Sequence, residues 1–177
     1  MKKDISGSGG QRMISSFDIV KYTLIGMAVA IGLLVLLNRV FGIVTVSGSS
    51  MNPTYYDGDI LRGEIVTDST GIERGDIVTF SYKGTVLIKR VEGLPGETLS
   101  FDSGHIYIDG KLLDTDFPPM KDAGILADGK TITLGKDEYF CLGDNRNNSM
   151  DSRVFGPVKR SKIRSKIVQS LFLKPRE

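Results

Sequence analysis

The chain has 177 residues, and 23 basic against 21 acidic residues leave a formal net charge of +2. This length allows one sizeable domain, at roughly 100–200 residues per domain, and the balanced charge excludes the strongly basic surface of a nucleic-acid-binding protein. One cysteine, Cys141, and one histidine, His105, are too few for an intrachain disulfide or for a zinc site of Cys and His ligands. We therefore expect no metal, no cofactor and no nucleic-acid partner.

The polar residues 1–21 are rich in Gly and Ser and predict a flexible tail. The next run, "YTLIGMAVAIGLLVLLN" at 22–38, has 17 residues and no charge, which is the short limit for crossing a bilayer core of about 30 Å. Apolar residues resume after Arg39, whose side chain can snorkel, so we expect a transmembrane anchor over 22–44. Cationic residues precede the run, and they predict a cytoplasmic tail and an extracytoplasmic domain at 45–177. These cations are Lys2, Lys3, Arg12 and Lys21.

Two other interpretations of the apolar run remain open. A cleaved signal peptide has a shorter apolar core of about 7–15 residues and a small-residue cleavage site, and "VTVSGS" at 44–49 could serve as such a site. A buried core helix is the other possibility, although the run is apolar on all faces. An uncleaved anchor is the favoured interpretation.

Beyond Pro53 the sequence consists of short β-rich runs separated by turns. Hairpins are indicated by "DSG" at 102–104 and "DG" at 109–110. We predict a mainly β fold, with a small antiparallel β-sheet or barrel-like domain tethered by one N-terminal transmembrane helix. The expected strands lie within 76–82, 85–93, 97–101, 105–111, 130–135 and 138–144.

Three further features of this domain have simple structural interpretations. Cys141 lies in an apolar, strand-like run and is expected to be a buried thiol, with a reactive thiol as the alternative. His105 begins a hairpin among polar neighbours and is expected at a surface turn. The C-terminal run "KRSKIRSKIVQSLF" at 159–172 alternates basic residues with Ser or Ile, which indicates either a solvated strand face or a contact with anionic lipid headgroups.

The segment "SGSSMNPT" at 47–54 places three serines directly after the apolar run. A serine hydroxyl becomes a useful nucleophile only when a base removes its proton. Lys89 is a candidate base because it lies beside Arg90 in an apolar strand, where alternation points one of the two inward. Burial lowers a lysine pKa by up to about 3–5 units, which would yield an amine able to accept that proton. The alternative is an edge-strand lysine without a catalytic role.

A third segment, "GDNRNNSMDSRVFG" at 143–156, is dense in hydroxyls, amides and opposite charges. Such a loop can orient a lysine through a serine hydroxyl and brace a site with salt bridges. Its charged residues are Asp144, Arg146, Asp151 and Arg153.

With these segments the chain resembles the type I signal peptidases, a family of Ser–Lys dyad proteases. The resemblance covers the whole chain and rests on "SSMNPT", "RGDIVTF", "IKRVEGLPGE" and "GDNRNNSMDSRVFG", in the family's order and approximate spacing. It implies a membrane-bound serine endopeptidase that removes N-terminal signal peptides from exported preproteins. It also implies a catalytic β domain at 45–177, contact with membrane lipid, no cofactor and a monomeric state.

The resemblance assigns roles to individual positions. Ser50, directly before a methionine, matches the nucleophile, and Lys89, 39 residues later, matches the base. Ser149 matches the serine that hydrogen-bonds the lysine. The structural and ion-pairing positions match Asp144, Asp151 and Arg153, with Arg90 as a further ion-pair partner.

Gly48 is a departure from some members, which place there a hydroxyl that helps to hold the oxyanion. Backbone N–H groups, including that of Ser50, would then hold the oxyanion alone. Glycine at this position indicates the Gram-positive branch of the family. Met51 is expected to form an apolar wall that faces substrate or lipid.

The short link between anchor and serine suits a substrate that is itself held in the membrane. About four residues separate Val46 from Ser50, and at up to ~3.6 Å each they keep Ser50 within roughly 15 Å of the membrane surface.

Three rival functions remain. Self-cleaving repressor-type Ser–Lys proteases share the serine–methionine and lysine–arginine pairs, but they carry a DNA-binding head in place of an apolar span. A membrane-anchored signal-peptidase-like factor for pilus or surface-protein assembly is expected to lack Ser50 or Lys89. A secreted β-rich binding module would require removal of the apolar run.

Overall fold

The computed structural model describes residues 15–127 and 129–176, without the side chains of 37–41. The chain divides into an N-terminal unit that ends at Val40 and a second unit that begins at Phe41. Residues 1–14 of the tail expected at 1–21 lie outside the described residues.

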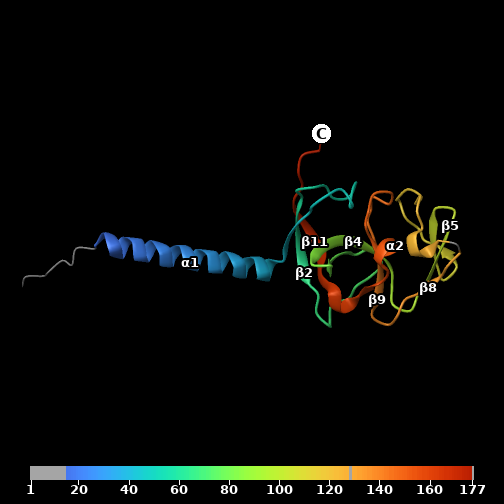
Figure 1. Ribbon diagram of the computed structural model, residues 1–177, viewed down its shortest axis with the longest axis horizontal. Helices are drawn as coiled ribbons and strands as arrows, with labels where there is room; N and C mark the ends of the chain where they lie inside the picture. The colour runs from blue at the N-terminus through green and yellow to red at the C-terminus, as the bar shows by residue number, and fades with distance from the viewer. Residues whose placement is uncertain (1–14, 128, 177) are drawn as a thin grey trace, which may run out of the picture. The chain divides into compact units, whose positions relative to one another are not determined.

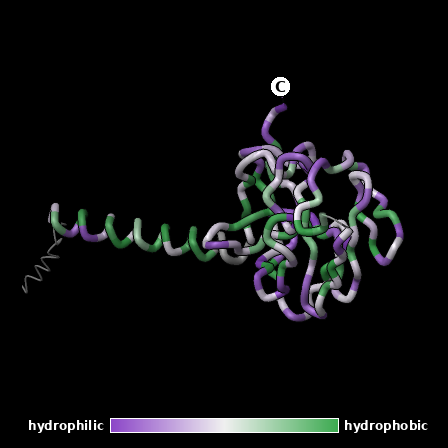
Figure 2. The backbone as a smooth tube through the Cα atoms, turned by 45° about the vertical axis from the view of Figure 1, so that its right-hand side comes forward, coloured by the Kyte–Doolittle hydropathy of each residue, from purple (hydrophilic) through white to green (hydrophobic). Residues whose placement is uncertain are grey.

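The N-terminal unit contains helix α1, Ser16–Phe41, except for its last residue. Ser15 caps this helix, because its hydroxyl accepts the N–H of Asp18 at 3.2 Å while the Asp18 carboxylate accepts the N–H of Ser15 at 3.2 Å. Apolar side chains are exposed all round the helix, and green predominates along it in Figure 2. Within the described residues, Ser16–Leu36 is the one helical stretch long and apolar enough to cross a membrane. The helix thus starts six residues before the expected anchor.

Helix α1 ends three residues before the anchor boundary expected at residue 44. Helix α1 ends at Phe41, and Gly42 turns the chain with a φ of +56°. Ile43–Thr45 then form strand β1, which pairs with Ile60–Ile65 (β2). Residues 43 and 44 therefore belong to the β domain, because their backbone hydrogen bonds are made to a strand of that domain.

The described residues of the second unit form two antiparallel sheets. The larger sheet has the order β1-β2-β11-β3-β4-β9-β10, and the smaller has the order β7-β6-β5-β8. Figure 1 shows β5 and β8 at one end of the domain, with β2 and β11 at the other. The remaining strands are β3 (Ile77–Tyr82), β4 (Thr85–Gly93), β5 (Thr98–Asp102), β6 (His105–Ile108), β7 (Lys111–Leu112), β8 (Ile132–Thr133), β9 (Glu138–Leu142), β10 (Val158–Lys159) and β11 (Ile163–Phe172). Short helical turns are η1 (Gly124–Leu126), η2 (Arg160–Lys162) and α2 (Ser152–Phe155).

The prediction of a mainly β, antiparallel fold is confirmed, and each of the six expected runs contains a strand. The hairpins expected at 102–104 and 109–110 are also present, and a third lies at 83–84. In each, two successive residues have positive φ, as a two-residue turn of type I′ requires. The C-terminal run forms a strand over 163–172, as expected.

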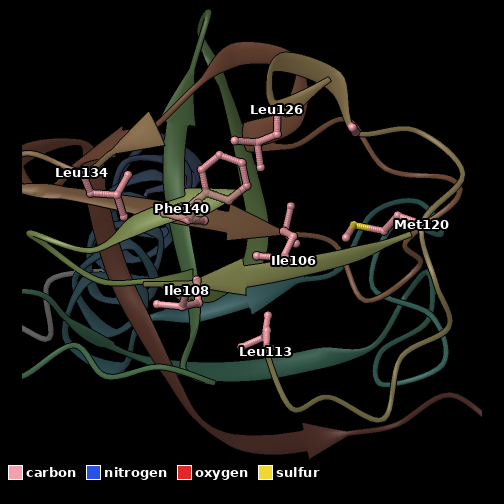
Figure 3. Packing of buried hydrophobic residues seen from close by; sticks show 10 residues of the cluster. Ile106, Ile108, Leu113, Met120, Leu126, Leu134 and Phe140 are labelled. Carbon is pink, nitrogen blue, oxygen red and sulfur yellow. The ribbon is translucent and has the colours of Figure 1, made fainter. Parts of the chain in front are cut away.

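Three apolar clusters stabilise this unit. The first joins the smaller sheet to β9 and includes Phe140, which lies between Leu134 and Leu126 in Figure 3. The second lies on β3, β4 and β9 and contains Cys141. Cys141 is fully buried, and burial raises the pKa of its thiol, so the prediction of a buried thiol is confirmed.

The third cluster explains how the serine segment reaches strand β4. Val46 and Met51 pack on Leu61, Ile77 and Ile88 of β2, β3 and β4. In the sheet order, β1 and β4 are separated by three strands, which in a flat sheet of ~4.8 Å spacing would place them about 19 Å apart. Residues 46–51 therefore cross one face of a curved sheet.

We expect Phe140→Ala to lower the free energy of unfolding by about 3–5 kcal/mol, because it removes a fully buried ring from the first cluster. Leu112→Ala is the control, since this side chain is 56% exposed and its loss should change stability by less than ~1 kcal/mol. Denaturant unfolding of the detergent-solubilised protein measures both. Equal unfolding midpoints for the two variants would contradict this packing.

Candidate active site

The structure brings Ser50 and Lys89 into direct contact. Ser50 lies in the turn that follows β1, and Lys89 lies on β4. The Lys89 Nζ donates to Ser50 Oγ at 2.7 Å and to the Ile88 carbonyl at 2.8 Å. When the lysine is neutral, the bond between Nζ and Oγ can reverse, with the hydroxyl as donor. A serine and a potential base therefore meet with no intervening group.

Lys89 is 2% exposed, so its side chain points into the domain. Burial removes water that only the charged ammonium needs, and this lowers the pKa of Lys89 from its usual 10.5 to about 8. The carboxylates of Asp151 and Asp144 act in the opposite direction but do not cancel the effect of burial. The lysine can therefore lose its proton at mildly alkaline pH.

The Asp144 carboxylate, fully buried, is held by Arg90 in a two-pronged ion pair. The guanidinium donates from Nε to Oδ1 at 2.8 Å and from Nη2 to Oδ2 at 2.7 Å. Its Nη1 also donates to the Gly75 carbonyl at 2.8 Å, and the Thr54 hydroxyl donates to Asp144 Oδ2 at 2.5 Å. This pair joins β4 to the loop after β9 and to the segment that follows Ser50.

Asp151 and Arg153 form a second buried ion pair in the same loop. Arg153 donates from Nε to Asp151 Oδ1 at 2.9 Å and from Nη2 to Oδ2 at 2.8 Å. The carboxylate also caps helix α2 by accepting the Arg153 N–H and accepts the Gly143 N–H at 3.1 Å. Both ends of the loop over 143–151 are thereby fixed to one carboxylate.

Glu92 and Arg146 form a third ion pair. The sequence pointed to Arg146 as a charged residue of the loop but did not identify Glu92 as its partner. Both side chains are buried, and the Phe117 ring lies against the guanidinium groups of Arg146 and Arg90, at 4.6 Å and 5.2 Å from its centroid. Strand alternation could have revealed Glu92, since it lies two residues after Arg90 and points to the same face of β4.

The hydrogen bond implied between Ser149 and Lys89 is not present. Ser149 Oγ is buried and has no hydrogen-bond partner among the described residues. The hydroxyl does lie at the site, because a Cβ on Gly143 would clash with both Ser149 Oγ and the Ser50 carbonyl. The lysine amine is instead directed to Ser50 Oγ and the Ile88 carbonyl.

Gly48 lies two residues before the serine with a φ of +85°, and its N–H donates to Asp57 Oδ1 at 2.8 Å. The N–H of Ser50, in contrast, donates to no acceptor within residues 15–127 and 129–176. Of these two amides, only the one on Ser50 is free to bind a substrate oxygen.

The expectation that Met51 forms an exposed wall is wrong. The side chain has no exposed surface, because residues 46–51 cross the sheet and press it into the third cluster. Met51 therefore anchors the serine segment to the core.

The family model described as "Signal peptidase, peptidase S26" matches residues 17–172. The chain belongs to this family. Signal peptidase I V of Bacillus subtilis strain 168 is 38% identical over 143 residues, which cover 71% of this chain and 83% of that protein. Signal peptidase IB of Staphylococcus aureus strain COL is 33% identical over 141 residues, with 70% and 73% covered.

Among solved structures, the crystal structure of a signal peptidase I from Enterococcus faecalis V583 is 29% identical, with a TM-score of 0.45. The match covers 56% of this chain and 98% of that one. Membership of the signal peptidase family confirms the resemblance inferred from the four motifs. This membership makes the protein a peptidase, and it does not favour the rival functions.

We expect Arg146→Met to lower the free energy of unfolding by about 3–5 kcal/mol, because it leaves the buried Glu92 carboxylate without its partner. The double variant Glu92→Leu, Arg146→Met removes both charges and should recover most of that loss. Denaturant unfolding of the three proteins gives the comparison. A double variant no more stable than Arg146→Met would argue against an ion pair as the cause.

Proposed function

We propose that this signal peptidase family member is a membrane-bound serine endopeptidase that removes N-terminal signal peptides from exported preproteins, with Ser50 as nucleophile and Lys89 as general base. The observation that carries the assignment is the 2.7 Å contact between Lys89 Nζ and Ser50 Oγ at a buried lysine. A base must lie within hydrogen-bond reach of the proton that it removes. This pair meets that requirement directly.

The proposed reaction is an acyl transfer in two stages. Neutral Lys89 takes the proton of Ser50 Oγ as the oxygen attacks the scissile carbonyl carbon, and the Ser50 N–H helps to hold the resulting oxyanion. The ammonium of Lys89 then gives its proton to the leaving amine, and the peptide C–N bond breaks. In the second stage Lys89 deprotonates a water, which attacks the acyl-enzyme and releases Ser50.

The ion pairs support this chemistry by controlling the charge around the lysine. Asp144 and Asp151 would each stabilise the ammonium form of Lys89 and so oppose its use as a base. Arg90 and Arg153 donate two hydrogen bonds each to these carboxylates. Their positive charges offset the carboxylates, which leaves burial as the dominant influence on Lys89.

We further propose that α1 is an uncleaved anchor with a cytoplasmic N-terminus, so that the β domain lies outside the membrane. The length and apolar surface of the helix support an anchor, and the four cationic residues up to Lys21 support this orientation. A monomer with lipid contact at the anchor suffices for this function, since both proposed catalytic residues come from one chain.

We expect Ser50→Ala to abolish cleavage of a presecretory protein without loss of fold, because it removes the attacking oxygen. The purified protein in detergent is incubated with the precursor, and N-terminal sequencing of the product locates the cut. Ser47→Ala is the matched control in the same segment and should cleave at close to the wild-type rate. Normal cleavage by Ser50→Ala would disprove its role as nucleophile.

We expect kcat/KM to rise with pH through a value of about 8. The lowered pKa of Lys89 means that its competent, neutral form is scarce well below this pH and dominant above it. Lys89→Arg should be nearly as inactive as Lys89→Ala, because a guanidinium stays protonated (pKa above about 12) and cannot act as a base. Near-normal turnover by Lys89→Arg would rule out the lysine as base and leave charge pairing as its role.

A further inference from the structure

The backbone carbonyls of Ser49 and Ser50 accept hydrogen bonds from the loop over 143–149, and Asn145 is the donor of both. The N–H of Asn145 donates to the Ser50 carbonyl at 3.1 Å, and its side-chain Nδ2 donates to the Ser49 carbonyl at 3.1 Å. Asn148 adds a weaker contact, with its Nδ2 at 3.3 Å from Ser49 Oγ. Two successive carbonyls of the serine segment are therefore held by one asparagine 95 residues away in the chain.

This arrangement fixes the direction of the Ser50 N–H. The Ser49 carbonyl and the Ser50 N–H belong to one planar trans peptide unit, in which they point to opposite sides. The Ser49 carbonyl accepts two hydrogen bonds, one from Asn145 Nδ2 and one from the Asn52 N–H at 3.1 Å within the same turn. With the carbonyl held on this side, the Ser50 N–H is turned to the other, and Asn145 supplies the part of this hold that comes from the loop. The Ser50 N–H has no acceptor within the described residues, whereas the Gly48 N–H is already bound by Asp57.

We propose that Asn145 is a positioning residue, which orients the Ser50 N–H toward the substrate oxyanion by holding the Ser49 carbonyl. This inference rests on the proposed function, because an oxyanion arises only if Ser50 is the nucleophile. This orientation matters because Gly48 has no hydroxyl that could add a side-chain donor to the backbone N–H of Ser50. The loop thus orients the Ser50 N–H in a segment that has no hydroxyl at position 48.

The same loop provides a matched control in Asn147. Its side chain accepts the Lys121 N–H at 2.8 Å and donates to the Pro119 carbonyl at 3.3 Å, so its bonds are to a different segment. Asn147→Ala removes two loop contacts without releasing the Ser49 carbonyl. It therefore reports what a general loosening of the loop does to the enzyme.

The test compares Asn145→Ala with Asn147→Ala by preprotein cleavage and by affinity for two peptides of one sequence, ending in an aldehyde or in an amide. Ser50 Oγ adds to the aldehyde carbon to form a hemiacetal, whose oxygen uses the oxyanion donor, whereas the amide peptide binds without covalent addition. We expect Asn145→Ala to lower kcat and aldehyde affinity about tenfold, the worth of one well-placed hydrogen bond. KM and amide affinity should be unchanged, and Asn147→Ala should match the wild type in all four quantities.

Wild-type kcat and aldehyde affinity in Asn145→Ala, or an equal loss of affinity for both peptides, would overturn the proposal. Should Asn145→Ala fail to fold, the nearly isosteric Asn145→Asp takes its place, because it puts an acceptor against the Ser49 carbonyl and should lower the same two quantities. Full activity of Asn145→Ala together with an inactive Ser50→Ala would refute this inference alone. An active Ser50→Ala would refute the proposed function itself.

Discussion

The contact between Lys89 and Ser50 depends on the removal of water from the lysine. An exposed lysine at the same 2.7 Å distance would remain an ammonium near neutral pH and could donate to the serine but not accept its proton. Burial of the Lys89 side chain on the inner face of β4 favours the neutral amine at mildly alkaline pH. The rest of the domain excludes water from Lys89 and holds Ser50 within hydrogen-bond distance of its amine.

Two parts of the fold meet this requirement. Residues 46–51 cross the curved sheet with Val46 and Met51 in the core, which brings Ser50 over β4. The loop over 143–151, fixed at both ends by Asp151, then packs so tightly on the Ser50 backbone that only glycine fits at 143. One segment thus supplies the nucleophile and the other holds its backbone, and Lys89 lies beneath both on a strand of the sheet.

The sequence predicted the apolar helix, six of the strand regions and the pairing of a serine with a buried lysine. These predictions succeed because the features arise from local periodicity or from four motifs whose residues act together. The end of helix α1, the burial of Met51 and the missing bond to Ser149 were not predicted, since each depends on how segments far apart in the chain pack. Asn145 was overlooked for the same reason, because its partner at Ser49 is close only after the sheet has curved.

The most direct test of this account is the ionisation of Lys89 itself, observed without reference to catalysis. Carbon-13 NMR of lysine labelled at Cε, in the full-length protein in detergent, follows each amine through its titration, and the resonance lost in Lys89→Arg identifies the one of interest. The account predicts a midpoint close to 8 for this resonance. A midpoint near the usual value of 10.5, in protein that still cleaves precursors, would contradict it.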